Sequence, residues 1–346
     1  MRVLLVDNLM IRRYGNLRMG PGRKLMCGCV RNNYRFCEFS DRDMARLLAP
    51  IGIRKIGGVI ANRKLVLTAR NFRPDAILIG HCDYITNETL VQIREILPAV
   101  KIAHFNVDPI WQPSTRHQLD VRRDSCDALF VTTAGENLKS WLTDKNVVAY
   151  MPNPSDRSME HGDVSALPAQ ACAADLFFAG NPREGDPRLE VIDYLVQNLP
   201  SKLRFRLFGM RGNPSIWGAA YEQVLASSAM SINLNRKEGD KWYSSDRIAH
   251  LMGYGILTFL SDKGQMERFF SPGDCVFYST PEDLVEKIGW YHTHDDARQR
   301  VAHTGRLTYH RLFSGERVLR FMLETLFGES YSESYEWAEE VYRRSN

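Results

Sequence analysis

Short apolar runs alternate with helical patterns along most of this chain. In the first half, runs that could form strands cover residues 2–6, 34–39, 76–79, 101–105, 128–132 and 147–151. Helical patterns lie between them, at 23–32, 62–71, 87–97 and 135–142. Because strands that alternate with helices form a parallel sheet with helices on both faces, the first half is predicted to be a doubly wound α/β domain.

The alternation breaks between residues 151 and 175 and then resumes. This segment holds three prolines and no sustained periodicity, which is typical of a connection between domains. Beyond it, strand candidates lie at 175–179, 204–208, 230–234, 256–260 and 275–278. The predicted organisation is an amino-terminal domain over 1–155, a linker over 156–174, a second doubly wound domain over 175–328 and a carboxyl-terminal helix over 329–346.

Length and composition agree with two soluble domains. At roughly 100 to 200 residues per domain, 346 residues suffice for two cores, and 44% hydrophobic with 25% charged residues is close to the globular average. No apolar run approaches the roughly 18 residues that would span a bilayer, and the start of the chain indicates a first strand rather than a signal peptide. The seven cysteines are scattered without zinc-binding spacing, so a reducing, cytoplasmic location is expected.

Positive charge is concentrated near the amino terminus. Residues 1–75 contain 16 Lys and Arg against 5 Asp and Glu, although the whole chain has a net charge of only +4. An excess this local suits a phosphate-rich acceptor, an anionic membrane surface or nucleic acid. A solvated basic face without a partner is the alternative.

The stretch "SSDRIAHLMGYGILTFLSD" at 244–262 predicts a short helix, a glycine turn and a strand. Ser244 or Ser245 suits the N-cap. Arg247 and His250 share a face beside the apolar stripe, where a core helix would usually carry apolar residues. The unpaired N–H groups at the start of such a helix suit a phosphate.

The preceding stretch "SINLNRK" ends a predicted strand with polar and basic residues. Asn235, Arg236 and Lys237 follow the strand directly, and Ser245 and Arg247 open the next helix. Ligands bind at the carboxyl ends of strands in doubly wound sheets, so these residues are predicted to bind a diphosphate-linked ligand. A capped core helix is the alternative, because helices in parallel sheets often begin with Ser or Asp.

From "LASSAMSINLNRK" through "SSDRIAHLMGYGILTFLSDKGQMERFF", the sequence resembles the donor-binding half of GT-B glycosyltransferases. It is most similar to their CgeB-like branch, and the resemblance covers about residues 175–325. The stretches "PDAILIGHCDYI" and "KIAHFNVDP" are similar to the amino-terminal domain of the same proteins. The resemblance implies two Rossmann-like domains facing each other across a cleft, with a nucleotide sugar on the second and an acceptor on the first.

One position departs from the family pattern. His250 stands where relatives usually carry Glu, a carboxylate that is expected to hold the ribose hydroxyls, and Trp242 replaces the first Glu of a longer family signature. His250 is still predicted to contact the donor, where it would bind the ribose less tightly than a carboxylate or contact a different group. The nucleotide and the stereochemical course are left open. The resemblance also implies phosphate contacts from the first loop of the donor domain, "AGNPREG", through Gly180, Asn181 and Arg183.

Titratable residues follow three predicted strands of the first domain. Asp7 ends the first, His81 and Asp83 follow the third, and His104 and Asp108 surround the end of the fourth. An Asp at such a position often caps the next turn, but three at the same edge of a sheet favour a catalytic site. Asp108 and His81 are the predicted candidates for a base that takes the acceptor proton.

The glycine-rich stretch "GNLRMGPGRK" at 15–24 has neither GxxxxGK[ST] nor GxGxxG order, which argues against a nucleoside triphosphate or dinucleotide site. It is expected to form a mobile loop in which Arg18, Arg23 and Lys24 meet an anionic acceptor.

No metal site is predicted. Asp41 and Asp43 form a DxD pattern, but they open a helix, so capping is the better interpretation. His292 and His294 lie beside Asp295 without further ligands that would complete a metal shell. We therefore expect no cofactor, with Arg and Lys stabilising the departing diphosphate.

Together these patterns predict a cytoplasmic, metal-independent glycosyltransferase (EC 2.4) of cell-surface polysaccharide biosynthesis. Its partners would be a nucleotide-sugar donor, a glycan, lipid-linked or protein acceptor, and an anionic membrane touched at its inner face, but no nucleic acid. A nucleotide-sugar epimerase or hydrolase of the same fold is one alternative. A non-catalytic sugar-binding or assembly protein is the other.

Overall fold

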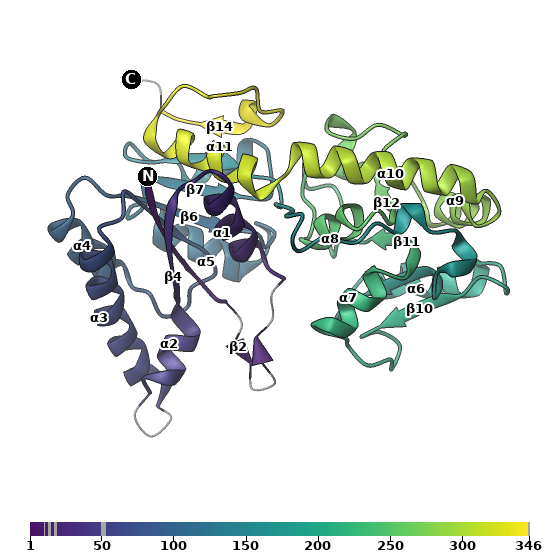
Figure 1. Ribbon diagram of the computed structural model, residues 1–346, viewed down its shortest axis with the longest axis horizontal. Coiled ribbons are helices and arrows are strands. Elements are labelled where there is room, and N and C mark those ends of the chain that lie inside the picture. The colour runs from purple at the N-terminus through teal and green to yellow at the C-terminus, as the bar shows by residue number, and fades with distance from the viewer. Residues whose placement is uncertain (10, 13–14, 17–18, 50–52, 345–346) are drawn as a thin grey trace. The chain divides into compact units, whose positions relative to one another are not determined.

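A computed structural model describes the chain except residues 10, 13–14, 17–18, 50–52 and 345–346 (Figure 1). The chain forms two compact units. Unit 1 comprises Met1–Pro154 and Ser314–Asn346, and unit 2 comprises Ser155–Phe313. None of the described helices is both long and apolar enough to cross a membrane.

Unit 1 is built on a seven-stranded sheet with the order β14-β8-β7-β6-β5-β1-β4. The strands are β1 (Arg2–Asp7), β4 (Arg35–Ser40), β5 (Ala76–Ile79), β6 (Lys101–Asn106), β7 (Ala128–Val131), β8 (Val147–Tyr150) and β14 (Val341–Tyr342). All pairings are parallel except that of β14 with β8. The six parallel strands confirm the predicted doubly wound class. A separate two-stranded ribbon joins β2 (Ile11–Arg12) and β3 (Gly15–Asn16).

Helices cover both faces of this sheet. They are α1 (Pro21–Arg31), α2 (Asp41–Leu47), α3 (Arg54–Phe72), α4 (Asn87–Ile96), α5 (Pro113–Arg122), the 3-10 helix η2 (Glu136–Trp141) and α11 (Gly315–Phe327). Successive side chains of a strand point to opposite faces. Leu4 and Val6 of β1 join one buried cluster with Leu65 of α3, whereas Phe130 of β7 packs edge to face on Phe321 of α11.

The carboxyl-terminal segment returns to unit 1. Helix α11 packs on α1 so closely that a Cβ on Gly28 would lie 2.3 Å from the backbone oxygen of Gly315. The expected helix over 329–346 is corrected: the segment contains a short 3-10 helix, η7 (Ala338–Glu340), and β14. Tyr335 and Trp337 pack their rings on Phe321, so aromatic contacts hold this segment without a helix.

The segment expected to be a linker over 156–174 belongs to unit 2. The N–H of Val164 donates to the carbonyl of Tyr254 at 2.8 Å, and Arg306 donates to the carbonyl of Gly162 at 3.1 Å. The segment also contains two 3-10 turns, η3 (Val164–Ala166) and η4 (Ala169–Ala171), and so is not an extended linker. The chain crosses between units at 154/155 and again at 313/314 rather than near 328.

Unit 2 contains a five-stranded, wholly parallel sheet with the order β10-β9-β11-β12-β13. Its strands are β9 (Ala174–Ala179), β10 (Phe205–Phe208), β11 (Ser228–Asn233), β12 (Leu257–Ser261) and β13 (Val276–Tyr278). Its α-helices are α6 (Arg188–Asn198), α7 (Ala219–Leu225), α8 (Arg247–Gly253), α9 (Pro281–Thr293) and α10 (Asp295–Leu312), with 3-10 turns η5 (Asp262–Gly264) and η6 (Met266–Arg268). Strand order reverses between β9 and β11, which is where such sheets bind ligands.

Candidate functional site

Three arginines meet at the carboxyl ends of β9 and β11. Arg188 begins α6, Arg236 follows β11, and Arg247 begins α8. The carbonyl of Asn181, just after β9, accepts hydrogen bonds from Arg188 Nη2 at 3.4 Å and Arg236 Nη2 at 3.0 Å. The strand ends therefore gather guanidinium groups from three separate segments.

Asp186 is the carboxylate between two of these arginines. Its Oδ2 lies 2.6 Å from Arg188 Nη2 and 3.3 Å from Arg236 Nε. Burial raises the pKa of Asp186, but the hydrogen bonds and charge of Arg188, aided by Arg236, outweigh it and leave that pKa at about 2. Asp186 is thus ionised at neutral pH and holds the two arginines in place.

Arg247 is partly buried and does not form an ion pair with Asp186. Its guanidinium lies 4.7 Å above the ring of Phe178, and Nη1 donates to the carbonyl of Leu234 at 3.2 Å. Burial, aided by the charges of Arg188 and Arg236 and opposed by Tyr221, lowers the pKa of Arg247 to about 10. The side chain remains protonated at neutral pH, so the three arginines with Asp186 keep a net positive charge that suits a diphosphate.

The polar residues before α8 anchor a loop rather than cap the helix. Asn233 Nδ2 donates to Ser244 Oγ at 2.8 Å, and Ser245 Oγ donates to Asn233 Oδ1 at 3.3 Å. Asp246 is the N-cap residue, so the expected serine cap is corrected. Asn235 Nδ2 donates to the carbonyl of Tyr243 at 3.2 Å. These bonds tie the end of β11 to the start of α8.

His250 lies between two carboxylates. Its Nδ1 is 2.8 Å from Glu160 Oε1, and its Nε2 is 3.1 Å from Asp246 Oδ2. Glu160 is wholly buried, and its side chain belongs to the segment that sequence reasoning treated as a linker. A ribose hydroxyl would have to displace one of these carboxylates, so the predicted ribose contact of His250 conflicts with this arrangement.

The other predicted donor residues differ in position. Gly180 lies at the site, where a Cβ would be 3.0 Å from the Phe178 ring. Arg183 is exposed in the following turn, and Lys237 is exposed and pairs with Asp240 at 3.1 Å. Sequence reasoning missed Arg188. Its signal was the "DPR" run at the start of a predicted helix.

In unit 1 the strand order reverses between β1 and β5, and a pocket of about 250 Å³ lies at their carboxyl ends. Asp7, Arg23, His81 and Asp108 all line it. His81 Nδ1 lies 3.5 Å from Asp108 Oδ2, and both side chains are over two-fifths exposed. The two predicted base candidates therefore lie side by side at the pocket.

Asp7 forms the buried wall of this pocket. Its Oδ1 accepts the backbone N–H groups of Asn8 at 2.8 Å and His81 at 2.9 Å. Gly22 and Gly80 leave the space for its carboxyl group, because a Cβ on either would lie within 2.6 Å of its oxygens. Burial raises the pKa of Asp7 to about 6, although these hydrogen bonds act in the opposite direction.

Replacing Asp7 with asparagine is expected to stabilise the protein at neutral and alkaline pH. The folded state holds the Asp7 proton more tightly than the unfolded state, so ionisation costs stability as the pH rises from about 4 to 6. Asparagine does not ionise, so it avoids this cost, and its side-chain oxygen can still accept the N–H groups of Asn8 and His81. The gain should be about 1 to 3 kcal/mol above pH 6 and vanish below pH 4.

Chemical denaturation of both proteins across this pH range measures the effect. An Asp124→Asn variant is the control, since Asp124 is largely exposed. Equal stability of Asp7→Asn and the parent protein at pH 8 would show that the buried carboxylate has no such cost.

Arg23 and Lys24, which were expected on one mobile loop with Arg18, do not share one environment. Helix α1 begins at Pro21, which makes Lys24 part of its first turns and buries it completely. The expected acceptor contact of Lys24 is therefore corrected. Arg23 lines the pocket and donates from Nη2 to the carbonyl of Leu9 at 3.0 Å. Arg18 lies outside the described residues.

The two aspartates of the DxD pattern have structural partners. Asp41 Oδ2 accepts the N–H groups of Asp83 at 2.7 Å and Tyr84 at 3.2 Å. Asp43 is hydrogen-bonded by Ser40 Oγ. Over the described part of the chain, no three His, Cys, Asp or Glu side chains are grouped as metal ligands would be.

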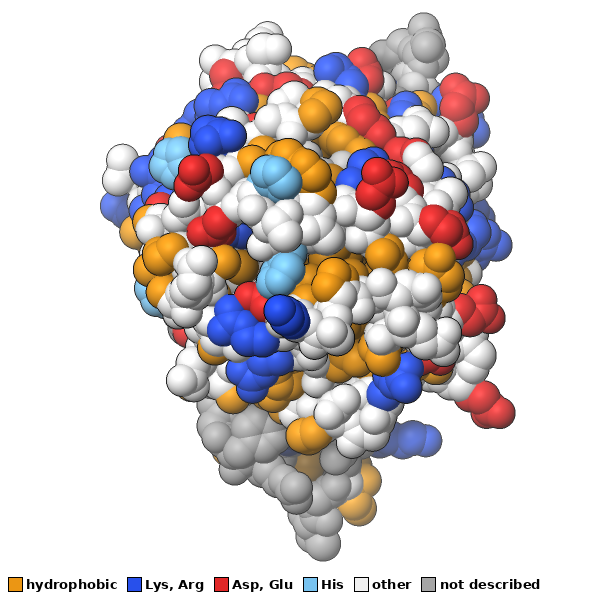
Figure 2. Space-filling model, turned by 90° about the vertical axis from the view of Figure 1, so that its right-hand side faces the viewer, with side chains coloured by type: hydrophobic (Ala, Val, Ile, Leu, Met, Phe, Trp, Pro, Cys, Tyr) orange, Lys and Arg blue, Asp and Glu red, His pale blue; other side chains and the backbone are white. Residues whose placement is uncertain are grey.

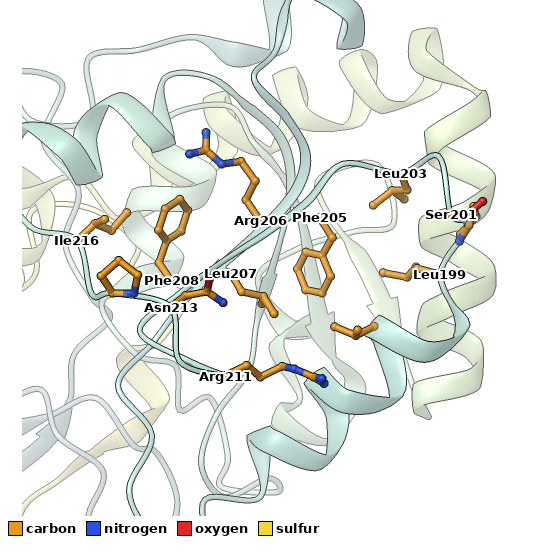
Figure 3. A pocket seen from close by; sticks show the side chains of 13 residues that line it. Leu199, Ser201, Leu203, Phe205, Arg206, Leu207, Phe208, Arg211, Asn213 and Ile216 are labelled. Atoms are coloured by element: carbon orange, nitrogen blue, oxygen red, sulfur yellow. The ribbon is translucent and has the colours of Figure 1, made fainter.

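A larger cavity of about 630 Å³ runs along β10 at the edge of the unit 2 sheet (Figure 3). Its walls are mainly apolar, with Phe205, Leu207 and Ile216 among them. The face in Figure 2 likewise shows hydrophobic side chains gathered between charged ones. The cavity contains no pair of titratable groups suited to acid–base chemistry, so it is not assigned to the site.

Comparison with known structures identifies the architecture. The chain matches the structure of Anabaena HepE in complex with UDP and glucose, with a TM-score of 0.60 and 15% identity. It also matches sucrose-phosphate synthase from Thermosynechococcus elongatus, with a TM-score of 0.63 and 10% identity. Each match covers 95% of this chain and 100% of the other. The chain has the GT-B fold. AviGT4, a glycosyltransferase involved in avilamycin A biosynthesis, matches 99% of this chain with a TM-score of 0.57 and 10% identity.

Sequence comparison supports the GT-B assignment within one region. A family model described as glycosyl transferase-like matches residues 188–324, which is less than half of the chain. The match includes all three arginines of the unit 2 site. A search of curated proteins gave no significant match. The CgeB-like branch stays a prediction.

Proposed function

We propose that this protein is a glycosyltransferase that moves a sugar from a nucleotide-sugar donor to an acceptor. The observation that carries the proposal is the arginine group at the switch point of the unit 2 sheet. HepE has been solved with UDP-glucose, and this chain shares its fold. A diphosphate bound by Arg188, Arg236 and Arg247 would leave with its developing charge already compensated.

The acceptor binds to unit 1. Its hydroxyl group enters the pocket at the ends of β1 and β5, and Asp108 or His81 takes the proton if the reaction inverts the anomeric centre. Asp7 holds the backbone of His81 and so positions that pair. Arg23 gives the pocket a positive group for an anionic acceptor. The proposed acceptor class is a glycan, lipid-linked or protein hydroxyl in cell-surface polysaccharide synthesis.

A nucleotide screen tests the donor half of this proposal. One of UDP, GDP, CMP and dTDP should raise the unfolding temperature, because a ligand at about 100 times its Kd adds about 2.7 kcal/mol to folding stability. Turnover of the matching nucleotide sugar with an acceptor mixture then distinguishes a transferase from an epimerase or hydrolase. Binding without any turnover would favour a sugar-binding protein, and no binding at all would contradict the proposal.

Metal independence is part of the proposal and has its own test. Full transfer activity should persist in excess EDTA, because three arginines supply the positive charge at the diphosphate. The measurement is the initial rate with EDTA, with added Mg²⁺ or with added Mn²⁺. Loss of activity in EDTA that either ion restores would contradict it.

A further inference from the structure

The outer side of α3 combines basic and apolar side chains. The helix has 19 residues, of which five are Lys or Arg and none is Asp or Glu. Leu65 and Ala69 on its inner side join the buried core. On its outer side, Ile56, Val59 and Leu67 have exposed fractions of 44%, 56% and 45%. Such exposure of several large aliphatic side chains on one helix calls for a partner.

Two of the basic residues, Arg63 and Arg70, lie on the same stripe as the aliphatic ones. Residues three or four apart share a helix face, and the exposed residues Ile56, Val59, Arg63, Leu67 and Arg70 follow that spacing over four turns. Long basic side chains can lay their methylene groups along an apolar surface while the charge reaches outward. The stripe therefore offers apolar contact and positive charge together.

The end of α2 extends this surface. A Cβ on Gly57 of α3 would lie 1.9 Å from the carbonyl oxygen of Ala45, so the two helices touch here. Leu47 is 78% exposed at the end of α2, and Ile53 is 49% exposed just before α3. The exposed residues that we call the α3 face are Leu47, Ile53, Ile56, Val59, Arg63, Leu67 and Arg70.

The charges around the α3 face limit its partner. Helix α4 packs beside α3 and exposes Glu88 and Glu95. Two copies of the chain that met through the α3 face would bring Arg63 and Arg70 of one copy toward those of the other, which is unfavourable. A nucleic acid would use the arginines but leave the aliphatic side chains in water. An anionic lipid surface satisfies both kinds of side chain.

We propose that the α3 face docks unit 1 peripherally on an anionic lipid surface. The aliphatic side chains enter the boundary between headgroups and acyl chains, and Arg63 and Arg70 meet the lipid phosphates. The surface is distinct from the pocket at β1 and β5, and docking does not depend on the transfer reaction.

The test uses the full chain with lipid vesicles. Binding to vesicles of phosphatidylcholine with phosphatidylglycerol should be strong at low salt, weaken as salt rises and be absent with phosphatidylcholine alone. Arg63→Glu/Arg70→Glu should weaken binding by roughly 30-fold or more, since each basic residue near the surface contributes about 5-fold. Ile56→Asn/Val59→Asn should weaken it by roughly 10-fold and leave its salt dependence unchanged.

A matched control comes from α10, which is similar in length. Arg300→Glu/Leu307→Asn changes one exposed base and one exposed apolar residue there, with Leu307 52% exposed. This variant should bind like the parent protein, and thermal unfolding should show that every variant is folded. Equal binding to neutral vesicles, equal loss in the control, tighter binding to DNA than to vesicles, or a dimer that the α3 substitutions dissociate would each overturn the proposal.

Discussion

Replacing Arg247 with alanine is expected to lower kcat/KM for sugar transfer by roughly 30-fold to 1000-fold, which is about 2 to 4 kcal/mol of transition-state stabilisation. Unlike Arg188 and Arg236, Arg247 does not pair with Asp186, and it is held by the Phe178 ring and the Leu234 carbonyl. Its charge is therefore positioned before any ligand arrives. A positioned donor that requires no reorganisation should act mainly on the leaving diphosphate.

The measurement is nucleotide affinity by calorimetry together with transfer kinetics. Arg206→Ala provides the control, because Arg206 is an exposed arginine of the same unit on β10. The substitution should not unfold the protein, since burial already makes the Arg247 charge unfavourable, as its lowered pKa indicates. A folded Arg247→Ala protein that binds and transfers like the parent would reduce α8 to an ordinary core helix.

Replacing His250 with alanine should destabilise unit 2 by about 1 to 3 kcal/mol, because it removes the hydrogen bond between the imidazole and a buried carboxylate. Glu160 is wholly buried and lies 2.8 Å from His250 Nδ1, while its other oxygen accepts the N–H of Asp156 at 2.8 Å. Sequence reasoning alone would expect only the loss of one ribose hydrogen bond. The structure instead indicates a loss of folding stability.

Chemical denaturation of His250→Ala and of Glu160→Gln/His250→Gln tests this cause. If the lost hydrogen bond to a buried carboxylate is responsible, the double variant should be the more stable of the two, because it replaces that carboxylate with a neutral amide. His117→Ala should change stability by about 0.5 kcal/mol or less, since His117 is exposed on α5. A small change for His250→Ala, with a large loss of nucleotide affinity, would restore the ribose contact.

The parallel sheets could be predicted from sequence because their strands are continuous apolar runs. Each of the predicted strands in both halves overlaps an observed strand, and the order reversals follow from the doubly wound class. The short β14 could not be found this way. Two residues have no measurable period, and they pair with β8, which lies far earlier in the chain.

The grouping of the candidate residues was predictable where they lie at or just beyond the end of a strand. Asn181, Arg236 and Arg247 come together because carboxyl ends of parallel strands share an edge. The partners of His250 were not predictable, since Glu160 is 90 residues away and lies in a segment without periodicity. The sequence also does not show which of two neighbouring basic residues is buried: Lys24 is buried in α1, whereas Arg23 lines the pocket.

The chain passes from unit 1 into unit 2 and then returns to unit 1. This path determines the order in which the two units can be completed during synthesis. Unit 2 is an insertion within unit 1, and its ends are adjacent, because the N–H of Ser155 donates to the carbonyl of Phe313 at 2.8 Å. A ribosome therefore releases all of unit 2 before α11 and β14 emerge. Until then α1 lacks the helix against which Gly28 packs, and the part of the sheet that α11 covers, at β6 and β7, stays exposed.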